Sequence, residues 1–237
     1  MVKMGVFAMI RWLLPLFPLA VHKFDHIVII LSVIGIIYAS CIALVQNDLK
    51  RLVAWSSIAH IGLMGAAIFS QNDSGIHGVM LEMFNHGINI IALWIVVDII
   101  NKKTGIRKIS ELGGLAAKSP SLAIFFVVIT LANIALPLTN AFVSEFLMFN
   151  GLFQFNKCYA AFACIGIILS AVYMLNMIQK IFFGVPNSLT ENAQPIDLRQ
   201  KVVLSVIVIT ILVLGVYPQP ILHLTQDTVT DILQRIK

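Results

Sequence analysis

Long apolar runs alternate with short polar connections along the whole chain. The apolar runs lie at residues 4–20, 27–45, 52–70, 76–100, 121–149, 158–181 and 201–217. A helix needs about 20 apolar residues to cross the hydrocarbon core of a bilayer, and these runs reach or approach that length. The pattern therefore predicts an all-α polytopic membrane protein with about seven transmembrane helices.

The composition agrees with this fold class. The 237 residues have a mean hydropathy of +0.94, and only 11% of them are charged. A soluble domain of this length cannot bury so much apolar surface. The first run has no polar leader and no small-residue cleavage site, and it carries Lys3 and Arg11. It is therefore predicted to be a helix of the bundle and not a signal peptide.

Lysines and arginines are divided unevenly between alternate connections. One set of connections holds ten of them: Lys50, Arg51, Lys102, Lys103, Arg107, Lys108, Lys118, Lys180, Arg199 and Lys201. The other set holds four, which are Lys23, Lys157, Arg235 and Lys237. This positive-inside asymmetry predicts a bacterial inner membrane protein whose C-terminus lies outside and whose N-terminus is cytoplasmic. It also explains the net charge of +5 without a nucleic-acid partner, so the expected surroundings are the lipid bilayer.

Two features limit the chemistry that the chain itself can carry. Its three cysteines, Cys41, Cys158 and Cys164, lack the close spacing of zinc or iron-sulfur ligands. No glycine-rich phosphate loop follows a predicted strand, as nucleotide binding would require. The chain is therefore expected to bind no metal and no redox cofactor.

The run from Ser121 to Phe149 contains Pro137 and, eight residues later, Glu145. In hydrocarbon a mid-span proline frees a backbone carbonyl, and an ionisable side chain is costly unless it faces protein or water. Transporters build ion sites from broken helices with charged groups near the break. Pro137 is thus predicted to mark a helix break, and Glu145 an ion site. The alternative is a structural glutamate with a permanent partner, such as a lysine of another subunit.

A second group of polar residues lies on the run 76–100. Glu82 and His86 are four residues apart, so they share one helical face and are placed to exchange a hydrogen bond or a proton. Asn85 and Asn89 add auxiliary polar groups around the same turn, which indicates a hydrated interior. The alternative is a polar pair that only links two helices.

Three further ionisable residues have less distinctive surroundings. His60 lies among small residues that permit close helix packing, and it suits a bridge between helices as well as a proton carrier. Lys3 and Asp98, read in isolation, are flanking charges at the membrane surface.

Three stretches, QNDLKRLVAWSSIAHIGLMG, MFNHGINIIALW and TLANIALPLTNAFVSEFLMF, closely resemble the antiporter-like membrane subunits of respiratory complex I, of the subunit M type. The resemblance implies two inverted five-helix repeats, each with a broken helix. Residues 1–22 would be the last helix of the first repeat, and residues 23–183 the second repeat. Residues 184–237 would form a linker, the terminal transmembrane helix and an outer amphipathic tail. The rest of the first repeat is expected on a separate polypeptide, or the chain is a fragment.

The resemblance also implies roles for individual residues. Lys3 would connect two half-channels, His60 and His86 would relay protons, and Glu145 would be the terminal group of the relay. Glu82 stands where many relatives have glutamine and would add a titratable group. Near the break, Leu138 and Ala141 stand where glycines are common.

The function implied by the resemblance is proton translocation as part of the membrane arm of an NADH-quinone oxidoreductase. NADH, FMN, iron-sulfur clusters and quinone would be bound by partner subunits. Two alternatives remain open at this point. The chain could belong to a multisubunit cation/proton antiporter or a membrane-bound hydrogenase, or it could be an inactive, truncated spacer in the membrane arm.

Overall fold

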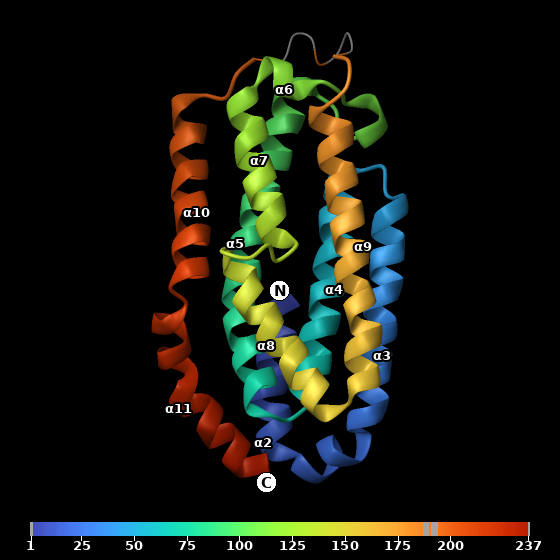
Figure 1. Cartoon of the computed structure of the whole chain (residues 1–237), viewed down its shortest axis with the longest axis vertical. Helices are drawn as coiled ribbons and strands as arrows, with labels where there is room; N and C mark the ends of the chain where they lie inside the picture. Colours follow the sequence, from blue (N-terminus) through green and yellow to red (C-terminus); the bar gives the residue numbers. More distant parts are fainter. Residues whose placement is uncertain (1, 187–189, 191–193, 237) are drawn as a thin grey trace.

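The computed structural model describes residues 2–186, 190 and 194–236. In this part of the chain every regular element is a helix, and the helices stand side by side in one elongated bundle (Figure 1). The elements are α1 (Val2–Ala8), the π-helical turn η1 (Met9–Leu13), α2 (Leu14–Leu16), α3 (Pro18–Val45), α4 (Leu49–Phe69), α5 (Asp73–Thr104), the 3-10 turn η2 (Ile109–Glu111), α6 (Leu115–Lys118), α7 (Pro120–Asn133), α8 (Asn140–Phe155), α9 (Lys157–Phe182), α10 (Leu198–Val216) and α11 (Gln219–Ile236).

Each predicted apolar run has a counterpart in the bundle. Among the described residues, α3, α4, α5, α9 and α10 are individually long and apolar enough to cross a membrane. The other two runs are composite, since residues 4–20 fold as α1, η1 and α2, and residues 121–149 as α7 and α8. The predicted all-α polytopic membrane fold is confirmed. Because α3 begins at Pro18, the expected boundary between residues 22 and 23 falls inside this helix.

Polar residues at the turns fix where the helices begin. The side chain of Asp48 accepts hydrogen bonds from the backbone N–H groups of Lys50 and Arg51 at the start of α4. Asn72 caps α5 by accepting from the N–H of Gly75 at 2.8 Å, and Asn156 caps α9 in the same manner. Such caps satisfy donors that the first helical turn leaves unpaired.

The span over residues 121–149 is broken at residues 134–139, where α7 ends and α8 begins. Pro137 lies in this loop, which is about halfway along the length of the bundle (Figure 1). Ala135 and Leu138 adopt φ values of +54° and +75°, which L-residues seldom adopt. A Cβ on Gly215 of α10 would lie 2.2 Å from the carbonyl oxygen of Leu138, so the backbone of α10 packs directly against the loop. The predicted broken helix is therefore present.

Two apolar clusters form the core of the bundle. We call the one that includes Leu52, Val96 and Phe126 the basic-end cluster, because it lies toward the lysine-rich connections. The other, which includes Met64, Val79 and Met148, is the opposite-end cluster. On α4, on α5 and on α7–α8, buried polar residues separate the two clusters. We call this level the polar belt, and its buried members are Ser56, His60, Glu82, Asn85, His86, Asn89, Thr130, Asn133, Thr139, Asn140, Ser144 and Glu145.

Glycines bring the backbones of α5 and α8 into close contact beside the belt. A Cβ on Gly78 would lie 2.7 Å from the backbone nitrogen of Met148. A Cβ on Gly151 would lie 2.5 Å from the backbone nitrogen of Gly75. Small residues allow membrane helices to approach this closely. The contact sets the height of α8 against α5, and therefore the height of Glu145 against Glu82.

Candidate functional site

The polar belt brings together ionisable side chains from four helices. Lys3 comes from α1, His60 from α4, Glu82 and His86 from α5, and Glu145 from α8. The last four are buried, with exposed fractions of 8% for His60, 0% for Glu82, 2% for His86 and 6% for Glu145. Residues that are distant in sequence thus meet in the middle of the bundle, away from water.

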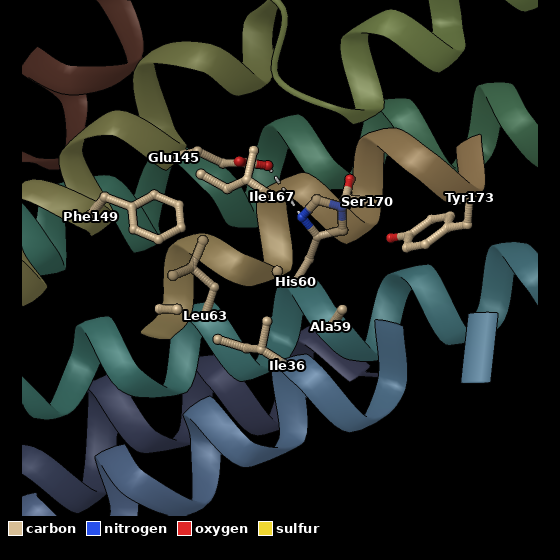
Figure 2. Close-up of a pocket in the computed structure, with 11 residues that line it drawn as sticks. Ile36, Ala59, His60, Leu63, Glu145, Phe149, Ile167, Ser170 and Tyr173 are labelled. Carbon is tan, nitrogen blue, oxygen red and sulfur yellow. Dashed lines mark ion pairs between the residues drawn. The ribbon is translucent and has the colours of Figure 1, made fainter. Parts of the chain in front are cut away.

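His60 lies between the other groups. Its Nδ1 atom is 3.3 Å from Oε1 of Glu145, the contact drawn as a dashed line in Figure 2. Its ring is also 5.0 Å from the ring of His86, measured between centroids. An imidazole can take up a proton on one nitrogen and release one from the other. His60 is therefore placed to pass protons between α5 and α8.

Glu82 belongs to the same group. Its Oε2 atom accepts a hydrogen bond from the hydroxyl of Ser144 at 2.5 Å. One ligand atom each of His60, Glu82 and Glu145 lies within 4.8 Å of the other two. Two carboxylates at this distance in a water-excluded interior repel each other strongly when both are ionised. The cluster therefore favours a bound proton or another cation, and its one nitrogen and two carboxylate oxygens form a donor set that a metal ion can use.

Lys3 approaches this group from α1. A Cβ on Gly87 would lie 3.8 Å from both Cε and Nζ of Lys3, so the ammonium group lies against α5 at Gly87, the residue after His86. The side chain is only partly buried. The structure thus places Lys3 at the belt, although its sequence position alone suits a surface charge.

Asn85 and Asn89 hold the broken helix to α5. The Asn85 amide donates to the carbonyl oxygen of Asn140 at 2.7 Å, and Asn140 donates back to the carbonyl oxygen of Asn85 at 3.3 Å. Asn89 donates to the carbonyl oxygen of Ala132 at 3.3 Å, near the end of α7. The two asparagines thus tie backbone carbonyls on both sides of the break to α5.

Sequence reasoning missed several polar residues of the belt. Ser56 accepts hydrogen bonds from Tyr173 at 3.1 Å and from Asn133 at 3.2 Å. Ser144 bonds Glu82, as described above. The sequence does hold a signal for both serines, because Ser56 lies one helical turn before His60 and Ser144 directly precedes Glu145. Tyr173 had no comparable signal, because it lies in the long apolar run of α9.

A small cavity of about 30 Å³ borders the His60–Glu145 pair (Figure 2). Ser170 and Tyr173 of α9 line its polar side, and Ile36, Leu63 and Phe149 are among its apolar walls. This volume is large enough for one water molecule. The site therefore has room for a proton carrier next to the pair.

Several buried atoms of the belt keep unused hydrogen-bonding capacity within the described part of the chain. They are His60 Nε2, both ring nitrogens of His86, Glu82 Oε1, Glu145 Oε1, Thr130 Oγ1, and the side-chain oxygens of Asn85, Asn89, Asn133 and Asn140. Buried polar atoms in proteins are normally bonded. Unused donors and acceptors in one continuous belt are suited to binding and passing protons.

Comparisons with known proteins agree with this architecture. A family profile described as "NADH:quinone oxidoreductase/Mrp antiporter, TM" matches residues 1–171. A relative from Rhodobacter capsulatus, NADH-quinone oxidoreductase subunit M, is 38% identical over 236 residues, which are 99% of this chain and 46% of the relative. The chain thus spans about half the length of the curated relatives it matches.

Solved structures match the fold. A chain of respiratory complex I from Thermus thermophilus superimposes with a TM-score of 0.93 at 24% identity, over 99% of this chain and 50% of that one. A chain of the Mrp complex from a Dietzia species gives a TM-score of 0.80 at 17% identity, over 99% of this chain and 53% of that one. The bundle with its broken helix is therefore a fold found in both kinds of complex.

Proposed function

Because the chain belongs to the NADH:quinone oxidoreductase/Mrp antiporter family of membrane subunits, we propose that it translocates protons within the membrane arm of an NADH-quinone oxidoreductase. The similarity to subunit M over nearly the whole chain favours this member of the family. The 3.3 Å contact between His60 and Glu145 inside the polar belt is the single observation that carries the proposal.

The proposed path runs from Lys3 to His86, then to His60 and finally to Glu145. The last two steps join neighbouring groups, since the two imidazoles are 5.0 Å apart and Glu145 contacts His60. The first step starts from Lys3, which lies against α5 at Gly87, the residue after His86. Glu82 lies within reach of His60 and Glu145, so its charge favours a proton on the imidazole between them. Quinone reduction in other subunits would drive the transfer.

The same proposal includes the orientation of the chain in a bacterial inner membrane. The basic connections after α3, α5 and α9 gather at one end of the bundle, and the end of α11 lies at the other (Figure 1). The positive-inside rule assigns the basic end to the cytoplasm. The C-terminus would then lie outside, and Glu145 would release protons to that side.

The partners are part of the proposal too. Other membrane-arm subunits would flank the chain, and NADH, FMN, iron-sulfur clusters and quinone would bind elsewhere, with no redox centre in this chain. Residues 1–22 would end the first repeat, residues 23–183 would form the second repeat, and residues 184–237 would form the linker, the terminal helix and the outer tail. The remainder of the first repeat would supply the path that leads to Lys3.

A second candidate function is cation/proton antiport. The neighbouring carboxylates of Glu82 and Glu145 favour it, because carboxylate oxygens are ligands for a hard cation such as Na⁺ as well as acceptors of a proton. The superposition on a chain of an Mrp complex supports the fold that this function would need.

Proton pumping by the assembled complex tests the proposal. Glu145→Gln is expected to lower the number of protons moved per NADH oxidised, because the amide does not carry a proton. The matched control is Asp98→Asn, which removes a half-exposed carboxylate that pairs with Lys102 far from the belt. An unchanged stoichiometry in Glu145→Gln would contradict the assigned role and favour a spacer. Sodium-driven proton movement without NADH would favour the antiporter.

A further inference from the structure

A groove at the basic end of the bundle has no part in the proposed proton path. It has a volume of about 640 Å³ and lies between the cytoplasmic-side ends of α4, α5 and α10, as oriented above. Its lining includes Lys50, Trp94, Lys102 and Arg199. These residues come from three helices that are distant in sequence, so only the fold brings them together.

The lining changes character along the groove. Cationic side chains surround its mouth, where Lys50 starts α4, Lys102 ends α5 and Arg199 starts α10. Ile91 and Val203 line its deeper part with exposed fractions of 59% and 47%. Ile91 and Lys102 are eleven residues apart, or about 16 Å along a helix. This length is close to one leaflet of a hydrocarbon core about 30 Å thick.

The described residues neutralise only part of the positive charge at the mouth. Asp98 is the one carboxylate in the lining, and its Oδ2 atom is 2.7 Å from Nζ of Lys102. Neither Lys50 nor Arg199 has a carboxylate partner in the described part of the chain. Nζ of Lys50 instead lies 5.5 Å from the ring centroid of Trp94. Two cations are therefore left to attract an anion.

A second basic pocket adjoins the groove and shares Lys50. It also contains Arg51, Arg107 and Lys108, together with Asp48. Asp48 caps α4 and lies 3.9 Å from Nε of Arg107, and Lys108 pairs with Glu111, which leaves Lys50 and Arg51 without a carboxylate partner in the described part of the chain. The side of Lys50 that faces away from the groove is thus positive as well, which strengthens the attraction for an anion at the mouth.

An anion with a hydrocarbon tail fits both parts of this site. A soluble phosphate would use the cations and leave the exposed apolar wall unused. A zwitterionic lipid would use the wall but bring a positive group to a mouth that is already positive. Basic pockets between transmembrane helices are suited to acidic lipid headgroups, and tryptophan favours the depth of the headgroups.

We propose that this groove binds an acidic phospholipid. Lys50 and Arg199 hold the phosphate, and one acyl chain lies along Ile91, Trp94 and Val203. This inference depends on the groove alone and does not require the proposed proton path.

Trp94 provides a local probe for the test, because the chain has only two other tryptophans, Trp12 and Trp55. The full chain with its native partners is placed in bilayers of phosphatidylcholine that contain increasing fractions of brominated phosphatidylglycerol or brominated phosphatidylcholine. The emission of Trp94 is the difference between a Trp12→Phe/Trp55→Phe preparation and one that also carries Trp94→Phe. Brominated phosphatidylglycerol is expected to quench this emission at a fraction at least about fivefold lower than brominated phosphatidylcholine.

Variants of the two cations make the test specific. Lys50→Gln and Arg199→Gln are each expected to weaken the preference for phosphatidylglycerol about fivefold. Lys118→Gln is the matched control, because Lys118 is a basic residue of the same end that lines neither pocket. Equal quenching by both lipids would overturn the proposal, as would unchanged preference in both variants. Absence of quenching would mean that a protein partner covers the groove. Relief of quenching by inorganic phosphate would mean that the groove binds a soluble anion. Either result would also overturn the proposal.

Discussion

The apolar clusters and the polar belt are built on the same helices, yet they differ in what their side chains can do. On α5, Val79 belongs to the opposite-end cluster and Val96 to the basic-end cluster, while Glu82 and His86 lie between them. The clusters fill space with side chains that need no partner. The belt contains ionisable groups and atoms with unused hydrogen-bonding capacity. The clusters therefore pack the two ends of the bundle, and the buried groups that can hold a proton are gathered in the belt.

The largest effect is expected when a charge is placed in one of the apolar clusters and not in the belt. Val79→Asp places an unpaired carboxylate at a fully buried apolar position less than one turn from Glu82. A charged residue in the middle of a membrane helix costs about 3 kcal/mol. The yield of folded protein and the temperature of unfolding should both fall sharply, as measured by thermal unfolding in detergent.

The control for Val79→Asp keeps a polar group inside the belt. Glu82→Gln retains an acceptor for the hydroxyl of Ser144, so its folded yield should stay near that of the parent. If Val79→Asp folded as well as Glu82→Gln, the apolar cluster would tolerate an unpaired carboxylate, and the distinction between the two regions would be wrong.

An intermediate effect is expected where the belt depends on close packing. Gly78→Ala places a Cβ 2.7 Å from the backbone nitrogen of Met148, so α5 and α8 must separate. Overpacking of this kind costs about 2 kcal/mol. Gly35→Ala is the matched control, because a Cβ there has no atom within 4 Å. Thermal unfolding should separate the two variants, and equal midpoints would argue against the close contact.

The smallest effect is expected at the helix break. Leu138 has a φ of +75°, which strains the backbone of an L-residue but not that of glycine, because glycine has no Cβ. Leu138→Gly should relieve about 1 kcal/mol of strain, and the greater freedom of the unfolded chain should cancel much of this gain. Leu136→Gly, where φ is not positive, should only destabilise. A lower unfolding temperature for Leu138→Gly than for Leu136→Gly would contradict the assigned backbone strain.

Sequence patterns predict the apolar regions of the helices better than they predict the polar belt. Hydropathy locates the apolar runs, and Pro137, the one proline within residues 121–149, marks the break. Hydropathy begins the second run at residue 27, whereas α3 begins at Pro18, because Lys23 and Asp25 near its start are polar. The π-helical turn at Met9–Leu13 has no sequence signal in the apolar pattern.

The belt depends on contacts that periodicity cannot provide. Spacing places Glu82 and His86 on one face of a helix, but it does not reveal that Ser144 and Glu145 lie against that face. The glycines at 78 and 151 set this register, and their partners are found only in the fold. Resemblance to a family supplied the expectation that His60 and Glu145 work together, and the 3.3 Å contact gives that expectation a geometry.

In the proposed path, Glu145 takes up and releases protons during turnover. Infrared difference spectroscopy of the assembled complex, recorded with and without NADH and quinone, tests this directly through the C=O band of a protonated carboxyl group. We predict a band that changes during turnover, disappears in Glu145→Gln and persists in Asp98→Asn. If the band survived unchanged in Glu145→Gln and this variant pumped protons as the parent does, the proposed role of Glu145 would be wrong.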